Sequence, residues 1–238
     1  SATVASVDTG PVENPATASL YNMARYLAYL AAALLIGTAA FVALCRPADR
    51  GPLRKPLVAG WWTLLATTLA LLLLRAPYET GTGPATAFGT SAVTRTLTGR
   101  PGLALLVRLA LLLIAAVFAV RASKRDAWSR PLLGAGAGLA VALALTWAAS
   151  EHASAGTQVP GAMTSSVLHL LAMSVWLGGL GALLILLHRT EVAAAAVARF
   201  SRVAFASVCV LVVTGVYQSW RGLGSWSALT ETTYGRLL

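Results

Sequence analysis

Two histidines in the second half of the chain are the side chains best suited to chemistry. His152 follows Glu151 at the end of one apolar segment, and His169 lies inside the next. An imidazole is costly to place in hydrocarbon, so a histidine there is a functional candidate by default. Met173 follows His169 by four residues, which puts both side chains on one face of a helix. A ring nitrogen and a thioether sulfur suit copper, and above all Cu(I).

These residues also have purely structural interpretations. A methionine in an apolar helix usually fills space, a histidine in a loop can simply be solvated, and His169 can hydrogen-bond to a neighbouring helix. The weaker candidates for a metal site are Met23 and Met163 on the side of the two histidines, Glu151 beside them, and Cys45 with His188 at the opposite side of the apolar segments. Cys45 and His188 are candidates for an exit site.

Arg108 is a charge inside the third apolar segment. Because such a charge is costly in lipid, the side chain is expected to face the bundle interior or a water-filled cavity. The carboxylates available as partners are Glu79, Glu151 and Glu231. An ion pair that holds the bundle together and a role in a permeation path both remain open.

The composition is that of a membrane protein. Of the 238 residues, 57% are hydrophobic and only 11% are charged, against about 25% charged in a typical soluble domain. The net charge of +10 does not indicate nucleic-acid binding, because the basic residues lie in short loops between apolar runs. The sequence has no GxSxG, P-loop or HExxH motif, so we do not expect an enzyme.

The apolar runs predict an all-α, polytopic bundle of transmembrane helices. Each run has roughly the length needed to cross a hydrocarbon core of about 30 Å, and only a helix satisfies its own backbone groups there. The segment 1–19 is polar and predicts an extracytoplasmic lead-in or tether, followed by a transmembrane domain over 20–238. The six predicted segments are Ala24–Leu44, Leu57–Leu74, Leu103–Val120, Leu132–Ala149, Val167–Leu187 and Val203–Trp220.

The basic residues predict the orientation. The loops after the first, third and fifth segments carry most of the lysines and arginines, and the loop after the fourth carries none. The positive-inside rule therefore places these three loops in the cytoplasm and the N-terminus outside. His152, His169 and Met173 then fall in the outer half of the membrane.

Glycines on the fourth and fifth segments predict how these two helices pack. Small residues allow close approach of helix backbones in a membrane. The glycines concerned are Gly134, Gly136 and Gly138 on the fourth segment and Gly178 and Gly179 on the fifth. Packing through these glycines would bring His152 and His169 near each other.

A weak internal repeat predicts that the chain is a fragment. Thr94–Arg100 precedes the third segment, and the similar Thr230–Arg236 lies 136 residues later (230 − 94). This similarity predicts the start of a seventh helix near the C-terminus. Two similar halves of this kind would give a complete protein of about eight helices.

Several stretches resemble the copper resistance protein D (CopD) family in type, order and spacing. They are Glu151-His152-Ala153, His169 to Leu180, Arg199-Phe200-Ser201-Arg202, Thr214-Gly215-Val216 and Thr233 to Arg236, with a fainter likeness at Gly99-Arg100 and Arg108. The resemblance implies a multi-pass protein of the bacterial inner membrane that takes up copper. It also implies a periplasmic copper-binding (CopC-like) partner, which can precede such a domain in the same chain. Glu151 departs from the pattern, since the family often has glycine before the histidine.

These observations give one leading hypothesis and two alternatives. In the leading hypothesis, copper binds outside at His152 and His169, with Met173 and Met163 assisting, and passes between the helices to the cytoplasm. In the first alternative, the two histidines ligate haem in an electron-transfer protein. In the second, the protein holds copper for an assembly partner without transporting it.

Overall fold

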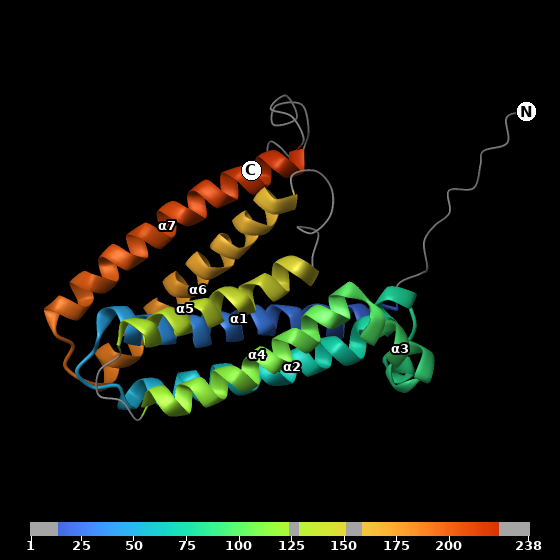
Figure 1. Cartoon of the computed structure of the whole chain (residues 1–238), viewed down its shortest axis with the longest axis horizontal. Helices are drawn as coiled ribbons and strands as arrows, with labels where there is room; N and C mark the ends of the chain where they lie inside the picture. Colours follow the sequence, from blue (N-terminus) through green and yellow to red (C-terminus); the bar gives the residue numbers. More distant parts are fainter. Residues whose placement is uncertain (1–13, 124–128, 151–158, 224–238) are drawn as a thin grey trace, which may run out of the picture.

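The computed structural model describes residues 14–123, 129–150 and 159–223, and within these ranges the chain is helical without any strand. Six helices are long and apolar enough to span a membrane. They are α1 (Pro15–Cys45), α2 (Arg54–Thr80), α4 (Arg100–Ser123), α5 (Arg130–Ser150), α6 (Val159–Arg189) and α7 (Ala194–Leu223). Each contains one of the six predicted segments, so the all-α polytopic fold is confirmed. The helices run lengthwise in alternating directions (Figure 1).

The helices extend beyond the apolar segments because local capping signals set their ends. α1 begins at Pro15, inside the segment expected to be a polar lead-in. The Asn14 side chain accepts hydrogen bonds from the backbone N–H groups of Ala16 and Thr17, at 3.1 and 3.2 Å. Pro15 occupies the first helical position, where its missing N–H group costs nothing.

The connection between α2 and α4 contains helical structure that the sequence analysis did not predict. Two short elements lie here, η2 (Pro84–Phe88) and α3 (Thr90–Thr98), in addition to η1 (Gly51–Leu53) before α2. Gly99 separates α3 from α4. A Cβ atom at Gly102 would overlap the carbonyl oxygen of Thr96, so glycine is required where α3 lies against the first turn of α4.

Two apolar clusters fill the bundle. The larger cluster joins α1, α2, α4, α5 and α6 and includes Tyr21, Leu64, Leu112, Trp147 and Leu170. The smaller cluster joins α1, η1, α6 and α7 and includes Phe41, Cys45, Leu53, Leu186 and Phe200.

The glycines of α6 pack against α1 and α7, and not against α5 as predicted. A Cβ atom at Gly178 would overlap the carbonyl oxygen of Ala33 in α1, and Gly179 lies against the Phe200 ring of α7. On α5, Gly134 and Gly138 have no described atom within 4 Å of an added Cβ. The predicted glycine contact between α5 and α6 is therefore wrong. α5 instead reaches α6 through Leu143, Ala144, Trp147 and Ala148, which join Val167 and Leu170 in the larger cluster.

The alternating helices put successive connections at opposite ends of the bundle (Figure 1). We call the end that carries η1 and the α6–α7 connection the basic end; its basic residues include Arg46, Arg54, Lys55, Arg189 and Arg202. We call the other end, where α3 lies and where α6 begins, the histidine end. The predicted seventh helix depends on residues 224–238, which lie outside the described ranges.

Candidate metal site

His169 lies on α6, about 15 Å along the helix from its start at the histidine end, at 1.5 Å per residue. Its imidazole is partly buried. The ring Nδ1 lies 2.9 Å from the hydroxyl oxygen of Thr214 on α7. The hydrogen bond between helices that was one interpretation of His169 is therefore present.

The hydrogen bonds of Thr214 favour one arrangement of the proton on His169. The Thr214 hydroxyl can donate its only hydrogen to the carbonyl oxygen of Val210, at 2.6 Å, and in that arrangement it accepts a bond from His169 Nδ1. A neutral ring with its proton on Nδ1 keeps the lone pair on Nε2. A metal-binding histidine typically has one ring N–H fixed by an acceptor while the other nitrogen binds the metal.

A polar strip continues from His169 between α6 and α7. The Ser165 hydroxyl donates to the carbonyl oxygen of Thr214, at 3.4 Å. The side-chain amide of Gln218 donates to the Ser165 hydroxyl, at 3.2 Å. The sequence analysis did not single out Ser165 or Gln218. The sequence feature that could have identified this strip is a four-residue spacing on two consecutive helices. Ser165 precedes His169 by four residues, and Thr214 precedes Gln218 by four, so each pair lies on one face of its helix.

The methionines have different neighbours from His169. Met163 and Met173 are partly buried and pack against the larger apolar cluster, whereas the His169 ring contacts α7. Met23 is 55% exposed on α1. Met173 thus lies one helical turn from His169, as the four-residue spacing predicts. The Met173 side chain, however, packs as a core residue.

The other half of the predicted histidine pair lies outside the described ranges. α5 ends at Ser150, and Glu151 and His152 follow it directly in the sequence. Within the described ranges, no group of three or more His, Cys, Asp and Glu side chains is placed to hold a metal ion.

Arg108 lies in the bundle interior, as expected, with 1% of its surface exposed. Its Nε donates to the Thr146 hydroxyl at 2.8 Å, and its guanidinium carbon lies 3.5 Å from the centre of the Trp147 ring. Both partners belong to the last turns of α5. Of its predicted partners, Glu79 is paired with Arg75, and Glu151 and Glu231 lie outside the described ranges.

Cys45 and His188 have unlike surroundings at the basic end. Cys45 is fully buried in the smaller cluster, and its carbonyl oxygen accepts a bond of 3.2 Å from Arg199. His188 is exposed, and its Nδ1 lies 2.8 Å from the carbonyl oxygen of Leu184. Each side chain has contacts of its own. That Cys45 and His188 form an exit site for copper stays a prediction.

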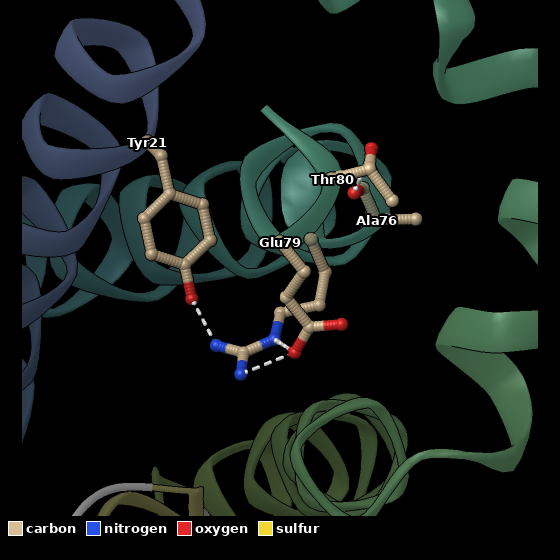
Figure 2. A network of polar contacts seen from close by, with 5 residues as sticks. Tyr21, Ala76, Glu79 and Thr80 are labelled. Carbon is tan, nitrogen blue, oxygen red and sulfur yellow. Dashed lines mark hydrogen bonds and ion pairs between the residues drawn. The ribbon is translucent and has the colours of Figure 1, made fainter. Parts of the chain in front are cut away.

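A second polar network near the histidine end ties α1 to α2. The guanidinium of Arg75 bonds to both Tyr21 and Glu79, and Figure 2 shows these two side chains approaching each other from α1 and α2. The guanidinium donates to the Tyr21 hydroxyl at 2.8 Å and forms an ion pair of 2.6 Å with Glu79. The Tyr21 ring also stacks on Tyr78, with centres 4.2 Å apart. This network fixes the two helices together and was not predicted from the sequence.

Two family models match the chain. The model for the copper resistance protein D-like N-terminal domain matches residues 16–162, and the model for copper resistance protein D matches residues 194–238. His152 and Thr214 fall within the matched stretches, and His169 falls between them.

A curated relative has a name that refers to copper. The copper transport protein CutJ of Bacillus subtilis (strain 168) is 29% identical over 242 residues, which cover 94% of this chain and 43% of that protein. The chain therefore spans less than half the length of this relative. No solved structure gives a significant match to the chain.

Proposed function

The chain belongs to the copper resistance protein D family, and on this premise we propose that it binds copper at the histidine end and carries it across the bacterial inner membrane. Family membership, the name of the relative and the six apolar helices connect the chain to copper and to the lipid bilayer. Uptake into the cytoplasm is part of the proposal, as is a role in copper resistance and homeostasis. The chain would act as a transporter and not as an enzyme.

The observation that carries the proposal is the hydrogen bonding of His169. The bond to Thr214 orients the ring, and with the proton on Nδ1 it leaves the Nε2 lone pair of the neutral ring available to a metal. Imidazole nitrogen is a suitable ligand for copper in either oxidation state. In the neutral ring with its proton on Nδ1, copper would bind Nε2 without displacing a proton.

The remaining ligands of the proposed site come from the sequence. His152 is the second imidazole candidate, and the thioethers of Met163 and Met173 are soft groups on the same helix as His169. Met173 would have to turn from the apolar cluster toward the metal, a change that the flexible methionine side chain permits.

The direction of transport in this proposal follows from the charges at the two ends. The positive-inside rule puts the basic end in the cytoplasm and the N-terminus outside. Copper would then arrive at the histidine end from the periplasm, delivered by a CopC-like partner, and leave at the basic end. The buried thiol of Cys45 lies on that path as a candidate exit ligand.

A flux assay tests the proposal. The protein would be reconstituted in vesicles and copper entry measured for the wild type, for His169→Ala and for Leu168→Ala. Leu168 is the matched control, since it adjoins His169 and is 46% exposed on the apolar surface. We expect entry to be lost only with His169→Ala. Unchanged entry in that variant would refute the site, and copper binding without entry in the wild type would indicate a copper-holding protein.

A further inference from the structure

A groove at the basic end separates the start of α2 from the end of α6. Its volume is about 440 Å³, within the usual range of ligand sites. Lys55 contributes from α2, and His188 and Arg189 contribute from the last turn of α6. Because it lies at the helix ends, the groove is at the level where lipid headgroups meet the protein.

The polar lining of this groove has one sign of charge. Its ionisable side chains are those of Lys55, His188 and Arg189, and no carboxylate contributes to the lining. Within the part of the chain that the structure describes, neither Lys55 nor Arg189 has an ion-pair partner. The His188 Nδ1 donates to the carbonyl oxygen of Leu184, since a carbonyl can only accept, and Nε2 can donate to an anion only when the ring is protonated.

A second cavity at the same end shows that this charge pattern is not general. That cavity has a volume of about 170 Å³ and is lined by Arg46 and Arg199 together with Asp49 and Glu191. Its two positive charges are thus balanced by two negative ones. The lining of the groove between α2 and α6 contains no carboxylate, and the Asp49 carboxylate, which is near it in the sequence, accepts a hydrogen bond from the backbone N–H of Gly51 at the edge of the groove. A net positive charge of this kind favours an anion.

The remaining walls of the groove are apolar. Leu184, Ile185, Pro52 and Pro56 line it beside the basic groups. Leu184 is 48% exposed, so this wall is open to the acyl chains around the bundle. A ligand that matches both walls has an anionic head and a hydrocarbon tail.

We propose that the groove binds the phosphate headgroup of an anionic phospholipid from the adjacent leaflet. Lys55 and Arg189 would donate charge-assisted hydrogen bonds to the phosphate oxygens, and a protonated His188 would add a third donor through Nε2. The first part of an acyl chain would lie along Leu184 and Ile185. Basic pockets between transmembrane helices are the usual sites for such headgroups. The lipid would hold the start of α2 and the end of α6 together.

Lipid titration of the purified protein tests this site. Affinity for phosphatidylglycerol and for phosphatidylcholine would be measured in neutral detergent by native mass spectrometry. The test variant is Lys55→Gln with Arg189→Gln. The control is Arg121→Gln with Arg202→Gln, which removes the same charge from exposed residues outside the groove. Lys55→Arg keeps the charge and should keep the affinity.

We expect phosphatidylglycerol to bind the wild type and the control variant equally. Affinity in the test variant should fall about 25-fold, as two losses of roughly fivefold each. All four substituted residues are exposed, so the unfolding temperatures without lipid should agree. Equal affinity in the test variant, an equal loss in the control variant, or full competition by the same concentration of inorganic phosphate would overturn the proposal.

Discussion

Replacing Thr214 by valine tests the role assigned to its hydroxyl. Valine keeps the shape of the side chain and removes the acceptor that lies 2.9 Å from His169 Nδ1. Val210 keeps its backbone hydrogen bond within α7, so the loss falls on the imidazole. The ring can then rotate, and either nitrogen can carry the proton.

The expected size of the effect follows from the kind of contact that is lost. Removing the group that orients a metal-binding histidine typically lowers metal affinity by about 10- to 100-fold, or about 1.4–2.7 kcal/mol. The net contribution of one such bond to folding is only about 1 kcal/mol. Thr214→Val should therefore weaken copper binding more than it destabilises the bundle.

The assay is a competition titration with a chromophoric Cu(I) chelator, made on purified protein and paired with a thermal unfolding curve. Thr214→Ser keeps the hydroxyl and should bind copper like the wild type. Wild-type affinity in Thr214→Val would refute the argument that the threonine orients His169. A loss of affinity only in proportion to a loss of folded protein would also contradict it.

Two further substitutions test the helix contacts. Gly178→Ala should destabilise the bundle by about 1–3 kcal/mol, because the added Cβ would overlap Ala33. Gly181→Ala is the control, since an added Cβ there has open space and should have no effect. Equal unfolding temperatures of the two variants in detergent would contradict the close packing of α6 against α1. Tyr21→Phe removes the bond from Arg75 and should cost about 1 kcal/mol, measured as a lower unfolding temperature. No change would mean that this hydrogen bond does not contribute to holding α1 against α2.

The fold could be predicted because hydrocarbon leaves few alternatives. Length and hydropathy identified all six long helices, since a backbone in lipid must form a helix. The helix partners could not be predicted in the same way. Gly178 indicates close approach by some helix, but only the three-dimensional arrangement shows that the helix is α1. Likewise, α3 is too short and too polar for a hydropathy pattern to reveal it.

The candidate site could be predicted only in part. His169 stood out because an imidazole in an apolar helix is unusual. Thr214 supplies its hydrogen bond from 45 residues away in sequence. The family resemblance included Thr214, but neither its type nor its spacing indicated that it would contact His169. For Arg108, the Trp147 ring and the Thr146 hydroxyl are two described partners that the sequence did not indicate. A search for opposite charges does not find an aromatic face, which also attracts a cation. Pairing with Glu151 or Glu231 stays a prediction, because both residues lie outside the described ranges.

The most direct test of the account is the copper content and absorption spectrum of purified wild-type protein, His169→Ala and Leu168→Ala. The account predicts bound copper in the wild type and in Leu168→Ala, a loss of copper in His169→Ala, and no Soret band in any of them. Copper retained by His169→Ala would contradict the assignment of this residue as a ligand. A Soret band that disappears with His169 would replace copper by haem at this site.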